Sequence, residues 1–214
     1  VLGLGGKQAS AALSAWFPTL PATPFSKVEH ALGTLLRVAD AFGSARYEWL
    51  TSAATARDVW PPLTAQLAKG GNDAWQLSEI HAGIPQITAA TQEQFVPQMV
   101  NFELLGGVNF KKGCYPGQEI VARSQYLGKL KRRAFLLSGD AAMAPAQEVF
   151  WSEDPGQPAG VLARTAADGA RHLALAELKI AVTRSGALHL GQPDGPLLQM
   201  LPLPYALPHD AETA

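Results

Sequence analysis

The sequence predicts an α+β chain whose last third forms a small antiparallel β-barrel. Helix-like and strand-like apolar patterns alternate over the first 130 residues, whereas short apolar runs separated by Gly, Pro or Asp turns recur from Arg132 onward. Hydrophobic residues make up 47% of the 214 residues and charged residues 16%, so the chain can bury a sizeable core. We therefore expect one domain over 1–130, a barrel domain over 131–208 and a frayed tail over 209–214.

The first domain is expected to alternate strands with helices. Three prolines make 18–26 a loop, because proline fits neither the interior of a helix nor that of a sheet. Ser52 is suited to cap the helix that follows it, and Pro61 and Pro62 should kink or restart this helix. The order of the first elements favours α+β or ferredoxin-like packing. The expected strands cover 1–5, 32–40 and 46–51, and the expected helices cover 6–17, 52–69, 75–83 and 115–126.

The expected barrel domain carries six apolar runs at fairly regular spacing, each bounded by turn residues. Short strands spaced in this way are typical of a small antiparallel barrel or a sandwich. The runs are AFLL at 134–137, EVFW at 148–151, GVLA at 160–163, HLALAEL at 172–178, ALHL at 187–190 and LLQML at 197–201.

Composition and charge exclude several classes of protein. The formal net charge is −1, so the chain as a whole carries no signal for binding nucleic acid or a membrane surface. Cys114 is the only cysteine, which excludes an internal disulfide and a CxxC motif and fits a reducing compartment, taken here as the cytoplasm. No apolar run reaches the roughly 18–20 residues of a membrane span. The five histidines are scattered without ligand spacing, so no metal site is expected.

The strongest functional signal is KKGCYPGQE at 111–119. Two glycines flank Cys-Tyr-Pro just before a predicted helix, and a thiol at that position beside Lys111 and Lys112 is one whose thiolate would be stabilised. One interpretation is therefore a reactive or ligand-contacting Cys114 on a rigid loop. The alternative is a small buried residue in a turn, since free cysteine is usually buried and inert.

Positive charge is concentrated around this motif. Glu119 is the only acid between 111 and 133, whereas seven residues of that segment are basic. Such a segment, interleaved with Tyr126, suits an anionic ligand or an RNA backbone, and the alternative is an ordinary solvated charge run. The basic residues are Lys111, Lys112, Arg123, Lys129, Lys131, Arg132 and Arg133.

KKGCYPGQE, followed by VAR at 121–123, resembles the signature of the YgfZ-type folate-binding family. Proteins of this family are relatives of the glycine-cleavage T-protein, an aminomethyltransferase, and are associated with iron–sulfur enzyme maintenance and tRNA modification. The resemblance continues upstream through FVPQMVN at 95–101 to Trp75, and downstream to LPLPY at 201–205. It implies an aminomethyltransferase-like folate-binding region over 1–130, incomplete at its N-terminus, followed by the β-barrel.

The resemblance also implies a set of folate-site residues around the signature cysteine, Cys114, which would act as a functional thiol. Trp75 matches the tryptophan that lines the pterin pocket, where an indole face can stack on the pterin ring. By composition alone the same residue would be a core aromatic. The other residues implied to contact the ligand are His81, Lys112, Gly113, Tyr115, Gly117, Gln118, Glu119 and Arg123.

The sequence departs from the T-protein pattern in two places. His81 stands where that pattern has a glutamate that holds the amino and ring N–H groups of the pterin, and an imidazole cannot accept two such donors. In addition, the chain starts without Met inside a predicted strand, and nothing in 1–74 stands in for the acidic residue credited with catalysis. We therefore expect that the family's N-terminal portion is missing, either because the chain is a fragment or because it is a shortened relative that cannot close the usual pocket, and that this chain does not catalyse aminomethyl transfer.

These implications lead to three hypotheses. The first is a tetrahydrofolate-binding accessory protein that supports iron–sulfur enzyme maintenance and tRNA modification, without a metal of its own, since one thiolate cannot hold an iron–sulfur cluster alone. The second is a folate-dependent aminomethyltransferase. The third is a module that docks RNA or a protein through the basic segment 111–133. The expected partners are folate, iron–sulfur client proteins and tRNA, with no membrane.

Overall fold

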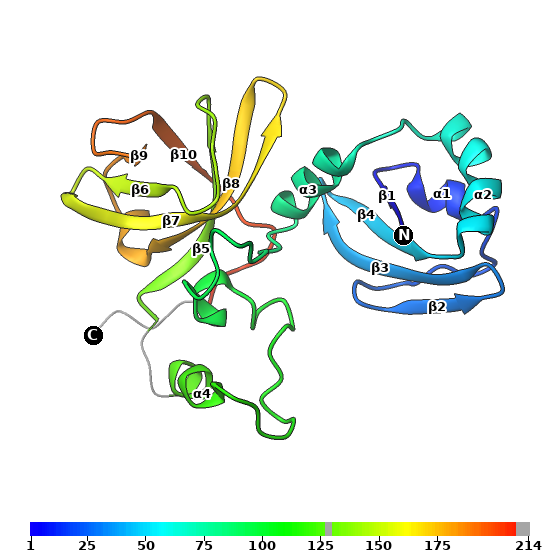
Figure 1. The fold of residues 1–214 in the computed structure, drawn as a ribbon, viewed down its shortest axis with the longest axis horizontal. Coiled ribbons are helices and arrows are strands. Elements are labelled where there is room, and N and C mark those ends of the chain that lie inside the picture. The colour runs from blue at the N-terminus through cyan, green and yellow to red at the C-terminus, as the bar shows by residue number, and fades with distance from the viewer. Residues whose placement is uncertain (127–129, 209–214) are drawn as a thin grey trace. The chain divides into compact units, whose positions relative to one another are not determined.

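The computed structural model describes residues 1–126 and 130–208. The chain divides into two compact units, Val1–Ala82 and Gly83–Ala214 (Figure 1). The predicted tail over 209–214 lies outside the described residues. The domain boundary predicted between 130 and 131 stays a prediction, and the first barrel strand begins at Arg132.

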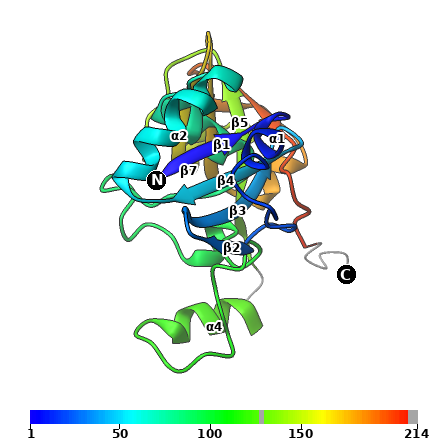
Figure 2. The ribbon, with the colours of Figure 1, turned by 90° about the vertical axis from the view of Figure 1, so that its right-hand side faces the viewer.

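A four-stranded antiparallel sheet forms the centre of the first unit, in the strand order β1-β4-β3-β2 (Figure 2). The strands β2, β3 and β4 follow one another as hairpins and β1 lies beside β4, so the ferredoxin-like alternative is wrong. The sequence pattern does not predict β2, because Val28 is its single apolar residue. The strands are β1 (Leu2–Gly5), β2 (Lys27–His30), β3 (Gly33–Ala41) and β4 (Ser44–Leu50).

Three helices accompany this sheet. Ser52 caps the second of them as predicted, and its Oγ accepts the backbone N–H of Thr55 at 3.0 Å. That helix runs through Pro61 and Pro62 without restarting, and the first helix covers only the middle of the predicted range 6–17. The helices are α1 (Ala9–Leu13), α2 (Ala53–Gln66) and α3 (Asn72–His81).

The two faces of the sheet pack against different helices. On one face Leu4 and Trp49 are buried against residues of α1 and α2, and the ring of Phe17 meets Trp49 edge-on with centroids 4.9 Å apart. Successive residues of a strand point to opposite faces, so Gly3 of β1 lies on the other side. A Cβ there would come within 2.7 Å of the ring of Trp75 on α3. The missing side chain therefore allows α3 to pack closely.

The second unit is built around a closed antiparallel barrel in the strand order β10-β5-β8-β7-β6-β9. This architecture confirms the predicted barrel, and each of the six predicted apolar runs contributes to one of its strands. The strands are β5 (Arg132–Gly139), β6 (Glu148–Trp151), β7 (Asp154–Asp168), β8 (Arg171–Lys179), β9 (Leu188–Leu190) and β10 (Leu197–Leu201).

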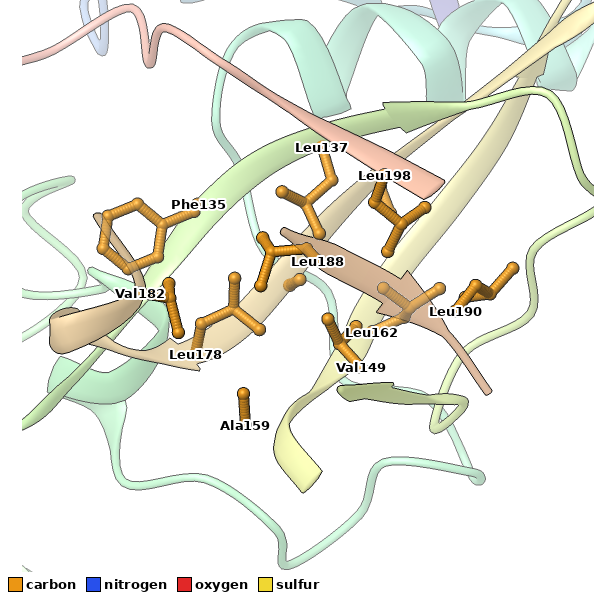
Figure 3. Close-up of a cluster of buried hydrophobic side chains, with 12 residues drawn as sticks. Phe135, Leu137, Val149, Ala159, Leu162, Leu178, Val182, Leu188, Leu190 and Leu198 are labelled. Atoms are coloured by element: carbon orange, nitrogen blue, oxygen red, sulfur yellow. The ribbon is translucent and has the colours of Figure 1, made fainter. Parts of the chain in front are cut away.

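Aliphatic side chains from these strands fill the interior of the barrel (Figure 3). Leu137, Leu162 and Leu178 are fully buried there, which accounts for the apolar runs in the sequence. β7 and β8 approach so closely that a Cβ on Gly160 would lie 1.7 Å from the carbonyl oxygen of Glu177. Glycine is therefore required at this point of the barrel.

The segment that precedes β5 in the second unit contains little regular structure. It includes the 3-10 helix η1 (Pro97–Val100) and the helix α4 (Gln118–Tyr126), which starts three residues later than the predicted helix over 115–126. Of the helices in the described part of the chain, none combines the length and the apolar character that crossing a membrane requires.

Candidate functional site

The signature loop, defined here as residues 111–117, leads directly into α4. Cys114 is exposed on this loop, so the interpretation of this residue as a small buried filler in a turn is wrong. Lys112 stands two residues before Cys114 in the same loop, and its Nζ lies 4.5 Å from the ring centroid of Tyr115. The loop is joined to the helix by the backbone N–H of Tyr115, which donates to Oε1 of Gln118 at 3.2 Å.

Gly117 completes the turn into α4 with a φ of +80°, a conformation that residues with a Cβ rarely adopt. Glu119 follows in the first turn of the helix, where a negative charge is favoured by the helix dipole. At Gly113 no neighbouring atom lies within 4 Å of the position that a Cβ would occupy, so the backbone beside the thiol is open. The loop therefore carries both the exposed Cys114 and the exposed Lys112, and its backbone at Gly113 is accessible.

Two members of the basic segment do not belong to an exposed cationic surface. Arg132 pairs with the buried carboxylate of Glu177 and donates to the carbonyl of Ala159 at 2.9 Å. Arg133 is 3% exposed and pairs with Glu103. Their charges are neutralised inside the second unit, so the expectation that the whole of 111–133 forms one cationic face is wrong for these two residues.

The remaining described cations of the segment are exposed. Lys129 lies outside the described residues. We call the exposed set the cationic face, and it consists of Lys111, Lys112, Arg123 and Lys131.

The outer side of α4 adds apolar surface to this set. Ile120 and Tyr126 are 62% and 70% exposed, and with Arg123 they follow one another at three-residue intervals along one side of the helix. The ring of Phe110 meets that of Tyr126 edge-on, with centroids 5.6 Å apart. An aromatic surface beside exposed cations has the chemistry of a single-stranded nucleic-acid contact.

Trp75 and His81 lie on α3, in the first unit. The guanidinium carbon of Arg46 lies 4.8 Å from the centroid of the Trp75 ring, and Gly3 approaches the same ring from β1. Arg46 itself is 2% exposed and donates to Oγ of Ser78 at 2.8 Å. Trp75 is half-buried, and it belongs to neither of the two main hydrophobic clusters.

His81 is the last residue of α3, and its ring lies against that of Phe42 with centroids 4.0 Å apart. Phe42 occupies the turn between β3 and β4 with a φ of +53° and is 61% exposed. A positive φ is uncommon for a bulky residue, and Phe42 adopts it at the position where its ring contacts His81. Sequence reasoning did not single out Phe42, because nothing in the pattern AFGS distinguishes it from an ordinary turn residue.

The structure thus places the predicted site residues in two groups, one on each unit. Trp75 and His81 share α3, and the other predicted residues share the signature loop and α4.

A hollow of about 100 Å³ in the first unit lies between β1 and the end of α2, and neither Trp75 nor His81 lines it. Among the residues that the structure describes, no group of three or more His, Cys, Asp or Glu is arranged to hold a metal ion.

Sequence reasoning also missed a buried polar cluster beneath α4. Gln98 and Asn101 are fully buried, and the amide of Asn101 donates to the hydroxyl of Tyr205 at 3.3 Å. Burial raises the pKa of the Tyr205 hydroxyl above its ordinary value, and the Asn101 hydrogen bond opposes this shift in part. The usable signal was the presence of two amides in the otherwise apolar run FVPQMVN at 95–101.

No known family profile matches the chain. The tRNA-modifying protein YgfZ of Photorhabdus laumondii subsp. laumondii is 44% identical over 146 residues, which cover 68% of this chain and 43% of that protein. The chain therefore spans less than half the length of this curated relative.

A crystal structure of aminomethyltransferase T of the glycine cleavage system from Bartonella henselae matches 93% of the chain and 57% of that protein, with a TM-score of 0.69 and 17% identity. A likeness at this level of identity concerns the fold, and it confirms the predicted α+β class with an antiparallel barrel. The chain belongs to the YgfZ-type family and has the fold of the glycine-cleavage aminomethyltransferase.

Proposed function

We propose that this chain is the tetrahydrofolate-binding part of a cytoplasmic accessory protein that supports tRNA modification and the maintenance of iron–sulfur enzymes. The observation that carries the proposal is the exposed Cys114 on a loop beside Lys112, at the start of α4. The kinship with a tRNA-modifying protein supports the cellular role, and the aminomethyltransferase fold supports the folate ligand.

Each group of site residues by itself suits one part of a folate. In the second unit, Lys112 and Arg123 of the cationic face are suited to form charge-assisted pairs with an anionic glutamate tail. In the first unit, the half-buried indole of Trp75 is suited to stack on a pterin ring. His81 offers the pterin a single ring-nitrogen acceptor, so we expect weaker binding than a carboxylate at that position would give.

Cys114 would act as a thiol toward a client protein rather than as a cluster ligand of this chain alone. An iron–sulfur cluster normally requires about four thiolates, and the sequence holds one cysteine. Any cluster would therefore be shared with a client protein, a second copy or a small thiol.

A folate-dependent aminomethyltransferase is the alternative that the fold favours. It would require an acid that activates the substrate amine, and residues 1–74 hold no residue that matches the catalytic acid of the T-protein pattern. An assay of the full-length gene product for folate-dependent release of a one-carbon unit separates the two functions. Turnover would favour the enzyme, and its absence would favour the accessory protein.

A tetrahydrofolate titration followed by tryptophan fluorescence tests the proposed ligand. The sequence contains five tryptophans, so the experiment needs two variants beside the wild type. We expect quenching that is lost in Trp75→Phe and retained in Trp60→Phe, whose indole is 44% exposed on α2. Equal quenching in both variants would argue against Trp75, and no quenching or binding in the full-length product would overturn the folate assignment.

RNA docking is a second candidate function, and the aromatic and cationic outer side of α4 favours it. Each phosphate contact that is removed should lower the salt dependence of tRNA binding by about 0.7–0.9 in a log–log plot. The double variant Lys111→Gln with Lys112→Gln should therefore bind tRNA with a smaller salt slope. Lys7→Gln with Lys69→Gln, which removes two exposed lysines of the first unit, is the matched control. Equal slopes would reject the cationic face as the RNA contact.

A further inference from the structure

The segment 97–103 carries polar side chains into the interior of the second unit, where η1 packs against α4. Gln98, at the second position of η1, is 0% exposed, although its amide group is strongly polar. Burial of an amide is costly unless the group is hydrogen-bonded. Its hydrogen bonds therefore indicate what the residue does.

The side chain of Gln98 reaches α4. Its Nε2 donates to the backbone carbonyl of Val121 at 2.7 Å. Val121 is 7% exposed and is the single buried residue of α4, whose other residues are exposed or half-buried. The helix packs against η1, and the buried Val121 side chain and the hydrogen bond to its carbonyl both belong to its attachment.

The backbone around Gln98 is held by the barrel. The carbonyl of Gln98 accepts a hydrogen bond from Nη1 of Arg133 at 3.2 Å, and the same guanidinium pairs with Glu103. The amide of Asn101 donates to the carbonyl of Ala134 at 2.9 Å. Arg133 and Ala134 both belong to β5. The backbone around η1 is therefore attached to the barrel, and the side chain of Gln98 connects it to α4.

The opposite end of this chain of contacts is the signature loop. Gln118, the first residue of α4, accepts the backbone N–H of Tyr115 through its side chain. Tyr115 follows Cys114 directly in the sequence. A continuous path of hydrogen bonds and covalent structure thus leads from β5 through Gln98 and α4 to the exposed thiol.

We infer that Gln98 is a positioning residue, whose amide holds α4 on the barrel and thereby fixes the signature loop and Cys114. What the loop does in this inference rests on the proposed function, whereas the placement of the loop by Gln98 does not. Gln98 is not one of the predicted folate-site residues. Its amide donates to the backbone carbonyl of Val121 and not to a predicted ligand-binding side chain.

The test compares Gln98→Met with Gln94→Met in the full chain. Methionine keeps the length and volume of glutamine but cannot donate to a carbonyl. Gln94 is an exposed glutamine four residues upstream, and its Nε2 also donates to a backbone carbonyl, that of Ala90 at 2.8 Å. The two variants therefore lose the same kind of hydrogen bond, and only one of them loses the contact with α4.

Two readouts follow the loop itself. We expect about tenfold faster hydrogen exchange of the α4 amides in Gln98→Met, because the net contribution of one buried hydrogen bond is close to a tenfold change in an opening equilibrium. The rate at which Cys114 reacts with Ellman's reagent should change in the same variant. The amides of β8 should exchange as in the wild type, and Gln94→Met should leave all rates unchanged.

Each outcome bears on the inference. Unchanged α4 exchange and thiol reactivity in Gln98→Met would overturn it. Faster exchange of β8 by the same factor as α4 would also overturn it, because Gln98 would then support the unit as a whole. Gln98→Asn, which keeps the amide but shortens the side chain by one methylene, should reproduce the loosened helix if reach to Val121 is what matters. None of these readouts needs folate, so a failure of the folate titration would leave this result standing.

Discussion

The carboxylate of Glu103 pairs with the guanidinium group of Arg133 inside the second unit, where the two side chains are 6% and 4% exposed. Arg133 extends from β5, and Glu103 is the last residue of the segment 97–103 that carries Gln98. The pair therefore connects the barrel to the residues beneath α4. The basic segment 111–133 suggests a binding surface in the sequence, but Arg133 of that segment forms an internal ion pair in the structure.

Removal of Glu103 should destabilise the protein strongly. In Glu103→Ala the buried guanidinium of Arg133 loses its counter-charge, and breaking a buried pair in this way costs about 3–5 kcal/mol of unfolding free energy. Urea unfolding measures the effect. Glu29→Ala, which breaks the exposed pair with Lys27, is the control and should leave the unfolding midpoint nearly unchanged. Similar midpoints for the two variants would contradict the buried pairing.

The stability of the protein should fall at alkaline pH through Tyr205. Burial raises the pKa of the Tyr205 hydroxyl above 10.0, its value in the unfolded chain. Between pH 10 and the raised pKa of the native state, the unfolded chain therefore releases the phenolic proton while the native chain retains it. The free energy of unfolding contributed by this group is therefore fully present below pH 10 and decreases as the pH rises further.

Unfolding of Tyr205→Phe across this pH range tests the assignment. The variant has no phenolic proton at this position, so its stability should depend less on pH above 10 than that of the wild type. It also loses the hydrogen bond from the Tyr205 hydroxyl to the carbonyl of Gly83, which lowers its stability at neutral pH. Tyr126→Phe, at an exposed position, should retain the wild-type slope. A wild-type slope in Tyr205→Phe would show that another group titrates.

The parts of the fold that the sequence predicts are those determined by local pattern. The six apolar runs define the barrel strands because the interior of the barrel is apolar, and Ser52 marks a helix start because its hydroxyl caps the helix. The strand β2 escapes prediction because it lies at the edge of its sheet with one apolar residue. The sequence alone could not predict the pairing of Arg132 with Glu177, because the partners lie 45 residues apart and meet through strand register.

The candidate site shows the same division between local and distant information. The motif at 111–119 predicts a loop that leads into a helix, because glycine and proline determine the local path of the chain, and the structure places the exposed Cys114 on such a loop. The role of Gln98 depends on a contact with Val121 across 23 residues, and no local pattern encodes it. The sequence therefore predicts the loop that carries Cys114 but not the residues that support this loop.

A methyl group at position 3 should displace the Trp75 ring. The Cβ of Gly3→Ala would lie 2.7 Å from Cε3 of Trp75, closer than van der Waals contact allows. Overpacking of this kind costs about 1–3 kcal/mol, so α3 or the indole must shift. We expect a changed tryptophan emission maximum and weaker tetrahydrofolate binding. Gly156→Ala, where no atom lies within 4 Å of the added Cβ, is the control, and equal behaviour of the two variants would contradict the close approach.

Replacement of Cys114 should separate function from stability. The thiol is exposed, so Cys114→Ala should change the free energy of unfolding by no more than about 0.5 kcal/mol. In a strain that lacks the gene, the full-length Cys114→Ala product should fail to restore iron–sulfur enzyme activity. Cys114→Ser keeps the size of the side chain but is a far weaker nucleophile than a thiolate, so it should fail as well. Full activity of Cys114→Ala would exclude a thiol role, whereas activity of Cys114→Ser alone would assign the position a polar contact in place of thiol chemistry.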